Sequence, residues 1–343
     1  IEVTVARGDV EPRYTLDEIK ALAREANELT GEPLPVEAGA AKGTVPAATL
    51  RTWVKALPGE DGLELAVDGA KAAKDLAALL PAAGTRAVET TFKVNGSEVV
   101  VVPGAVGTSC CEEEKTAGLV TAALRDRSLA PVKLPLKEIK PRFTAAEVAK
   151  LGIKEVVGTF RTNHPAGQPR VTNIHRIADL IRGQVIEPGG TFSINTFVGR
   201  RTTAKGFVSA PVIEDGKFTE DVGGGISQFA TTLFNAAFFA GLEFREYQSH
   251  SIYISRYPYG REATLAYPHP DLVIKNPTPY GVLIWPSYTA SSISVALYST
   301  KFYEVTTGEP TKSPQGVCTR VRTERTRTPV GGGAAKKDSI AAV

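Results

Sequence analysis

Three consecutive glycines, Gly223–Gly225, run directly into an apolar segment that predicts a helix beginning near Ser227 and Gln228. Free backbone N–H groups and the positive end of the helix dipole meet at such a point. Glycines also let a ligand or a reacting group approach the backbone closely. A serine placed there can act as a nucleophile beside oxyanion donors, here the amides from Gly225 to Gln228. We therefore predict that Ser227 is catalytic and that Gly223, Gly224, Gly225 and Gln228 bind ligand.

A serine nucleophile needs a general base, because a helix dipole activates a hydroxyl far less than a thiol. His250 is the candidate base, on a predicted strand after the helix. Glu262 or Asp271 could orient it and complete a serine, histidine and acid set. The alternative is that Ser227 only caps the helix, which is a frequent role of serine.

Further polar side chains are candidates for ligand contact. Arg200 can hold a carboxylate through two parallel hydrogen bonds, and Asn195 lies shortly before it. Arg256 and Arg261 bracket the segment Tyr257–Gly260, which could line a groove for a peptide carboxylate. For any single arginine, a surface salt bridge is the competing explanation.

Composition excludes several function classes. The 343 residues include 40 Lys and Arg against 37 Asp and Glu, and this net charge of +3 gives no argument for a nucleic-acid partner. The sequence contains no run of eighteen or more apolar residues, so it predicts no membrane-spanning helix. A signal peptide or membrane anchor could precede Ile1. The four histidines and the cysteines lack metal-site spacing, and no phosphate-binding loop or dinucleotide fingerprint is present. We therefore expect no metal and no cofactor.

Three cysteines are present, and two of them are neighbours: Cys110, Cys111 and Cys318. Adjacent cysteines rarely bridge each other, because the geometry is strained. We therefore expect one of the pair to bond Cys318 or a partner outside this sequence. Three reduced thiols are the alternative.

The length allows two domains joined by a linker. Residues 1–140 predict a first α+β domain, with a capping box at Thr15–Glu18 that opens a helix ending at Gly31 and a hairpin around Asn95–Gly96. A second capping box, Thr144–Glu147, predicts a short helix in the linker 141–153.

Residues 154–300 predict a second α+β domain, with a mainly antiparallel sheet packed on one central helix that starts at Ser227. Strands are expected at 154–160, 244–257, 263–267, 272–275, 281–285 and 292–298. Residues 301–343 predict a basic strand at 319–328 and a disordered tail from Gly331 onward. The arginines of that strand, Arg320, Arg322, Arg325 and Arg327, are expected to be solvated, or alternatively to suit an anionic wall polymer or membrane surface.

Roughly residues 155–300 resemble the VanW domain, whose pattern is Gly-Gly-Gly-Ile-Cys-Gln followed by a helix bearing Thr, Leu and Asn. Ser227 stands at the position of the family's cysteine, and Glu262 where aspartate is common. The matching motifs include Asn173–Ile174, Pro188–Asn195, Gly199–Thr202, Gly206–Phe207, Ala210–Ile213, His250–Ser251, Tyr257–Thr264 and Asp271–Asn276. Residues 10–140 resemble, in pattern, the peptidoglycan-binding-like domain often found beside VanW or L,D-transpeptidase domains.

The resemblance implies an extracytoplasmic bacterial cell-wall protein, secreted or anchored in the membrane and facing outside. Its partner would be peptidoglycan, whose stem peptides it would bind or act on. Some VanW proteins are regarded as L,D-transpeptidases that act through the cysteine, so an L,D-transpeptidase-like acyltransferase using Ser227 is one expectation. The alternative is a non-catalytic peptidoglycan-binding or scaffolding protein of the cell envelope, and a third is a structural envelope protein with a closed pocket. The family takes its name from vancomycin-resistance genes, which establishes no role in resistance here.

Overall fold

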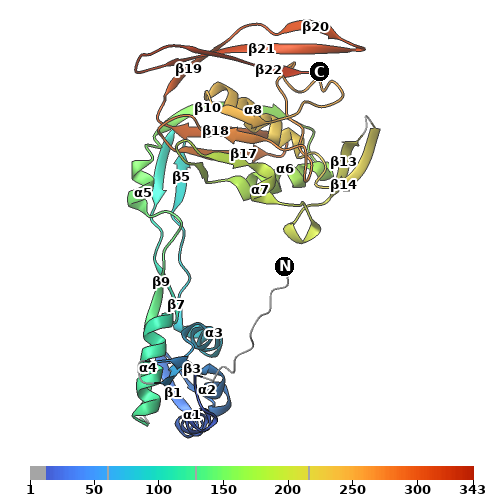
Figure 1. Ribbon diagram of the computed structural model, residues 1–343. Coiled ribbons are helices and arrows are strands. Elements are labelled where there is room, and N and C mark those ends of the chain that lie inside the picture. The colour runs from blue at the N-terminus through green and yellow to red at the C-terminus, as the bar shows by residue number, and fades with distance from the viewer. Residues whose placement is uncertain (1–12, 60–61, 128–129, 215–216) are drawn as a thin grey trace, which may run out of the picture. The chain divides into compact units, whose positions relative to one another are not determined.

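The structure, a computed structural model, describes residues 13–59, 62–127, 130–214 and 217–343, and the chain divides into two compact units (Figure 1). The first unit runs to Thr90 and continues from Gly104 to Thr144, and the second contains Thr91–Pro103 and Ala145–Val343. Both mix helices with mainly antiparallel strands, so the predicted α+β class is confirmed. The first twelve residues of the predicted domain 1–140 lie outside the described residues. No helix in the described part of the chain is long and apolar enough to cross a membrane.

The first unit is built from short elements around one apolar core that includes Leu50, Trp53 and Leu76. The predicted capping box is confirmed: Thr15 Oγ1 accepts from the backbone of Glu18, and Glu18 Oε2 accepts from Thr15 N at 2.7 Å. The helices are α1 (Leu16–Leu29), α2 (Ala47–Trp53), α3 (Gly69–Leu79) and α4 (Glu113–Arg125). The strands are β1 (Leu34–Ala38), β2 (Ala41–Val45), β3 (Val54–Pro58), β4 (Leu63–Val67), β7 (Gly107–Cys110), β8 (Val132–Lys133) and β9 (Leu136–Ile139).

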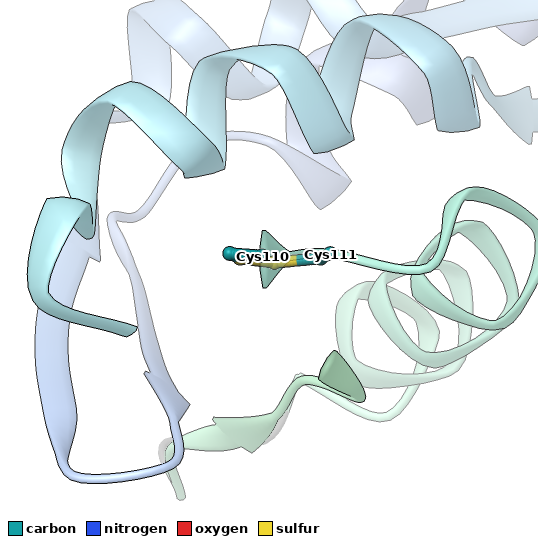
Figure 2. The surroundings of a disulfide bond; sticks show 2 residues. All are labelled: Cys110 and Cys111. Carbon is teal, nitrogen blue, oxygen red and sulfur yellow. A yellow bond between two sulfur atoms is a disulfide. The ribbon is translucent and has the colours of Figure 1, made fainter. Parts of the chain in front are cut away.

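The predicted cysteine pairing is wrong. Cys110 and Cys111, at the end of β7, form a disulfide with each other (Figure 2). Both residues are buried in the core of the first unit. Cys318 is free and exposed. The disulfide therefore lies within the first unit and does not involve the thiol of the second.

Two predicted local signals are confirmed next to the boundary between the units. Strands β5 (Thr91–Asn95) and β6 (Glu98–Val102) form the hairpin around Asn95–Gly96. The hairpin belongs to the second unit, where Tyr298 donates its hydroxyl to Gly96 O at 2.9 Å. Helix α5 (Ala145–Lys150) follows the second predicted capping box and ends before Gly152.

The second unit has a four-stranded antiparallel sheet in the order β10 (Glu155–Asn163), β18 (Ser292–Ser299), β17 (Val282–Thr289) and β11 (Gln184–Ile186). Helix α8 (Ser227–Phe239) packs against β10 and β18, and nearly all of its residues are buried. The predicted central helix is therefore confirmed, including its start at Ser227. Helix α6 (Pro169–Ile181) packs against β17.

Smaller elements complete the second unit. A second sheet has the order β12 (Thr191–Ser193), β16 (Val273–Lys275) and β15 (Glu243–Glu246). Helix α7 (Ile194–Val198) follows β12 directly. Strands β13 (Ser209–Glu214) and β14 (Lys217–Val222) form a hairpin that leads into the glycine run.

Two predicted strands between α8 and β16 are wrong. The strand expected at 244–257 ends at Glu246, and the segment 247–272, which includes the expected strand 263–267, contains no strand. Side chains bond several of its backbone groups: Thr231 Oγ1 accepts from Ala263 N at 3.1 Å and also donates to Ala263 O. Asn195 Nδ2 donates to Ala266 O at 2.7 Å. Because side chains distant in sequence satisfy this backbone, it needs no neighbouring strand.

The C-terminal residues are folded, so the predicted disordered tail is wrong. The basic strand is confirmed as β21 (Cys318–Pro329), and it pairs with β19 (Tyr303–Thr307), β20 (Thr311–Gln315) and β22 (Lys336–Ala342). Helix α8 lies between these strands and the four-stranded sheet (Figure 1).

Two of the four arginines on β21 are buried and bind the end of α8, so the expectation that all four are solvated is also wrong. Arg325 is 2% exposed and donates to Phe238 O at 2.7 Å and Leu242 O at 3.0 Å. Arg327 donates to Gly241 O at 3.1 Å. These bonds satisfy carbonyls that the helix end leaves without partners. Arg320 and Arg322 are exposed, as predicted.

Candidate functional site

One face of α8 carries a ladder of polar side chains that begins at Ser227. Ser227, Thr231 and Asn235 are spaced four residues apart, so they lie above one another on the helix. They bind the backbone of the segment 261–265: Ser227 Oγ accepts from Leu265 N at 3.1 Å, and Asn235 Nδ2 donates to Arg261 O at 2.9 Å. Ser227 is thus the first rung of a structural ladder. It is not the N-cap, a position that Ile226 occupies.

The glycine run has a packing role that the sequence did not reveal. Gly223 and Gly225 have φ values of +98° and +89°, which favour glycine. A Cβ atom at Gly223 would lie 2.9 Å from Arg201 Cβ, and one at Gly225 would lie 2.6 Å from Arg170 Cβ. The turn therefore lets two arginine side chains pack directly against it. Gly224, also predicted as a ligand contact, is buried against Ala210 O and does not line the cavity.

A cavity of about 1110 Å³ opens at the start of α8. Its wall brings together residues from five parts of the second unit: the β13–β14 hairpin, the start of α6, residues 200–201 after α7, the glycine turn and the segment 250–269. Of the residues predicted from sequence, it includes Ser227, His250, Gly223, Gly225, Arg200 and Arg256. Arg200 and Arg256 are exposed on this wall, where a ligand can reach them.

His250 and Glu262 form a buried pair at the cavity. His250 Nδ1 lies 2.8 Å from Glu262 Oε2, and their side chains are only 6% and 9% exposed. The sequence predicted this pairing, although His250 lies in a loop and not on a strand. Asp271, the other acid considered, accepts hydrogen bonds from the backbone of Asn195 and Leu272 and from the Ser193 hydroxyl. Glu262 is therefore the acid that can orient the imidazole.

Ser227 and His250 line the same cavity but are not bonded. In the described part of the chain, the contacts of Ser227 Oγ are Leu265 N and, at 3.5 Å, Thr264 Oγ1. Catalytic hydrogen bonds are often long or poorly aligned before substrate binds. The missing Ser227–His250 bond therefore does not by itself exclude His250 as the general base. The nucleophile and base roles stay predictions.

The predicted oxyanion donors are reduced to two amides. Gln228 N donates to Gly225 O at 3.1 Å and Ile226 N donates to Gly223 O at 3.4 Å, so both are engaged. The amides of Gly225 and Ser227 have no acceptor among the described residues. Both residues line the cavity, at the positive end of the α8 dipole.

Gln228, predicted as a ligand-binding residue, does not line the cavity. Its side chain is fully buried, and Nε2 donates to Thr162 Oγ1 and to Asn163 O, each at 3.0 Å. Its Oε1 accepts from Arg170 Nη2 at 3.1 Å. All of its polar capacity thus links α8 to β10 and α6.

Asn195 and Arg261 are also structural. Asn195 is buried, and its amide donates to Ala266 O and Pro268 O while its Oδ1 accepts from Arg201. The guanidinium of Arg261 lies over the rings of Phe238 and Phe239, at 5.6 Å and 5.1 Å from their centroids. Neither residue lines the cavity, so the structure does not bring these two predicted contacts together with the others.

Two cavity arginines were missed from the sequence, Arg170 and Arg201, whereas Tyr257 belongs to the segment expected to line a groove. Burial raises the pKa of the Tyr257 phenol, while Arg170 and Arg256 act against this rise. Burial lowers the pKa of Arg201 to about 10, although the interactions with Asp271 and Tyr267 act to raise this pKa. Arg201 is adjacent to a predicted residue, and Arg170 follows Pro169 at the start of α6, a position where an arginine usually faces solvent.

The site contains no set of metal ligands. In the described part of the chain, no three residues among His, Cys, Asp and Glu are grouped so that they could hold a metal ion. The polar groups at the cavity are the serine, the His250–Glu262 pair, the arginines and the free amides.

Comparisons with known proteins add to this geometry. Residues 169–298 match the family model described as VanW like protein. The chain is also similar to the uncharacterized protein YoaR of Bacillus subtilis (strain 168), with 29% identity over 225 residues that cover 66% of this chain and 74% of that protein. No solved structure matches the chain. The matched span includes α6, the glycine turn, α8 and the segment with His250 and Glu262.

Proposed function

We propose that this chain, which carries a VanW domain at residues 169–298, binds peptidoglycan stem peptides in the cavity beside Ser227. The observation that carries the proposal is the cavity itself. It exceeds the range of about 300–1000 Å³ typical of small-molecule sites, so it can take a short peptide. Four arginines, Arg170, Arg200, Arg201 and Arg256, line it, and two free amides lie on its wall. These are partners for the carboxylates and carbonyls of a peptide.

The proposal extends to location and to the first unit. We place the protein outside the cytoplasmic membrane, in the cell wall or anchored to the membrane, because that is where its proposed ligand lies. The first unit, whose sequence pattern resembles peptidoglycan-binding-like domains, would hold the chain on the wall. The second unit would engage the stem peptide.

Peptide binding is tested by equilibrium titration of the chain with soluble muropeptides that carry tetrapeptide or pentapeptide stems. Replacing both exposed cavity arginines (Arg200→Ala with Arg256→Ala) should weaken binding by about tenfold or more, since hydrogen bonds to charged groups are lost. Arg161→Ala is the matched control, because Arg161 is an exposed arginine on β10 outside the cavity. Equal weakening by the control, or none by the double variant, contradicts the proposed site.

Acyl transfer is the second candidate function, and the His250–Glu262 bond favours it. In this scheme Ser227 Oγ attacks a stem-peptide carbonyl while His250 takes the hydroxyl proton. The leaving amine then receives that proton, and an acyl-enzyme remains until a second amine displaces the serine. The free amides of Gly225 and Ser227 would bind the oxyanion.

Catalysis is tested by intact mass spectrometry after incubation with the same muropeptides. An adduct or cross-linked product that Ser227→Ala abolishes supports a serine acyltransferase. Product from Ser227→Cys alone supports a scaffold that now only binds. Binding without product from the native chain, Ser227→Ala and Ser227→Cys leaves the non-catalytic binding function and contradicts the second candidate.

A further inference from the structure

Two arginines of the cavity wall carry charges that no carboxylate pairs within salt-bridge distance in the described part of the chain. Arg170 donates from Nη2 to neutral oxygens, Gln228 Oε1 at 3.1 Å and Gly225 O at 3.5 Å. Arg201 is 6% exposed and donates from Nη1 to the amide oxygen of Asn195. Buried charges in proteins are normally paired, because moving an unpaired charge out of water is strongly unfavourable.

Both guanidiniums also retain N–H groups that have no hydrogen-bond partner among the described residues: Nε of Arg170, and Nε and Nη2 of Arg201. The Nε and Nη2 hydrogens of one guanidinium point in the same direction. They form the edge that binds a carboxylate through two parallel bonds. On Arg201 this whole edge is free.

The nearby acids leave the positive charge in excess. Asp271 favours the charged form of Arg201, but its oxygens already accept from the backbone amides of Asn195 and Leu272 and from Ser193. The acids on the cavity wall are Glu220 and Asp221 of β14, which are exposed and therefore screened. The N-terminus of α8 adds further positive potential at the same wall.

We propose that Arg170 and Arg201 form a subsite for one carboxylate of the bound ligand. This inference rests on the proposed function, since it takes the ligand to be a stem peptide and the carboxylate to be one of those that the peptide carries. The glycine turn holds both arginines in place, Arg201 against Gly223 and Arg170 against Gly225. Both arginines line the cavity, and their unpartnered N–H groups are buried in its wall.

The test changes the ligand and leaves the protein intact. Synthetic tetrapeptides are titrated into the full chain by calorimetry, one with all carboxylates free and others with a single carboxylate converted to the neutral amide. We expect amidation of one position to weaken binding by about tenfold or more, and of the others to matter less. Equal affinity for all peptides overturns the subsite while leaving the proposed function standing. Failure of every peptide to bind overturns both.

Variants assign the effect to the guanidinium. Arg201→Gln should remove the preference for the free carboxylate, and Arg201→Lys should restore only part of it, because lysine keeps the charge but lacks the fork. Arg161→Gln is the control and should keep the full preference. If Arg201→Gln fails to fold, the peptide series on the native chain still decides.

Competition distinguishes a carboxylate site from a phosphate site. Acetate should displace the free-carboxylate peptide at lower concentration than inorganic phosphate does. Stronger displacement by phosphate overturns the carboxylate assignment.

Discussion

At the scale of residues, Ser227 holds the segment that carries the site's acid and imidazole. Its Oγ accepts the amide of Leu265, three residues beyond Glu262. The same oxygen would be the nucleophile in acyl transfer. A change at Ser227 therefore has a structural effect that must be separated from any chemical one.

We predict that Ser227→Ala lowers the free energy of unfolding by about 1–3 kcal/mol, because the buried amide of Leu265 loses its acceptor. Urea denaturation followed by circular dichroism measures this. Thr264→Ala is the comparison, since Thr264 Oγ1 lies 3.5 Å from Ser227 Oγ and its loss should cost less. An unchanged denaturation midpoint for Ser227→Ala would show that the Leu265–Ser227 hydrogen bond contributes nothing to stability.

The sequence predicted the residues of the site better than their roles. Ser227 and His250 line one cavity and Glu262 is bonded to His250, because the helix start and the paired acid and base have local chemical signals. Gln228 and Asn195 were predicted as ligand contacts but are buried links. The residue type alone does not distinguish a polar side chain that binds ligand from one that bonds a distant backbone group. Arg170 and Arg201 were missed because their burial depends on the turn packed against them.

At the scale of elements, α8 is held at both ends by side chains from other segments. At its first turn, Arg170 donates to the Gln228 side chain. At its C-terminal end, Arg325 and Arg327 of β21 donate to backbone carbonyls. Asp338 of β22 pairs with both β21 arginines, at 2.8 Å and 2.9 Å. The position of Ser227 thus depends on a strand almost a hundred residues later in the chain.

We predict that Arg325→Met destabilises the protein by about 3–5 kcal/mol, because it leaves a buried pair broken and helix carbonyls without donors. Arg320→Met, an exposed change on the same strand, should stay within about 0.5 kcal/mol. Denaturant unfolding of both variants measures the difference. Equal stability of the two variants would contradict a stabilising role for the bonds from Arg325 to the end of α8.

The Asp338 pair also predicts a pH dependence. Burial raises the pKa of Asp338, but the hydrogen bonds and charges of Arg325 and Arg327 outweigh it and lower the pKa below the ordinary value of 3.8. A lowered folded-state pKa gives stability that is present above the unfolded value and is lost as pH falls through the folded one. The stability difference between the native chain and Asp338→Asn should therefore be largest near pH 7 and shrink below about pH 4. Urea titrations at both pH values test this, and a constant difference would rule out the ionic contribution.

Local signals predicted elements well, and long-range bonds account for the failures. The capping box at Thr15 and the hairpin at Asn95–Gly96 involve neighbours in sequence and were predicted correctly. The strand expected at 263–267 fails because Thr231 and Asn195 take its backbone bonds. Alternating apolar and polar residues cannot show whether a backbone pairs with a strand or with side chains.

At the scale of the whole molecule, the second unit extends beyond the matched VanW span. The family match ends at residue 298, whereas Ile340 of β22 belongs to the same apolar core as α8. The glycine-rich, alanine-rich composition after Val330 predicted disorder, but pairing with β21 and burial of Ile340 order this segment.

A chain that ends at Ser299 should therefore lose cooperative unfolding, because it lacks Arg325 and Arg327, which bind the end of α8, and part of the core. A chain that ends at Ala342 keeps both and should unfold as the native one does. Near-ultraviolet circular dichroism and thermal melts compare them. A sharp native-like transition in the shorter chain would mean that β19–β22 are an independent addition.

Hydrogen exchange with and without a soluble tetrapeptide muropeptide tests the central claim most directly. The amides of Gly225 and Ser227 have no acceptor among the described residues, so they should exchange fast in the free chain. We predict that the muropeptide slows exchange in the peptides that cover residues 223–228 and 250–269. Protection confined to the first unit, or unchanged exchange at the cavity under saturating muropeptide, would contradict a stem-peptide site beside Ser227.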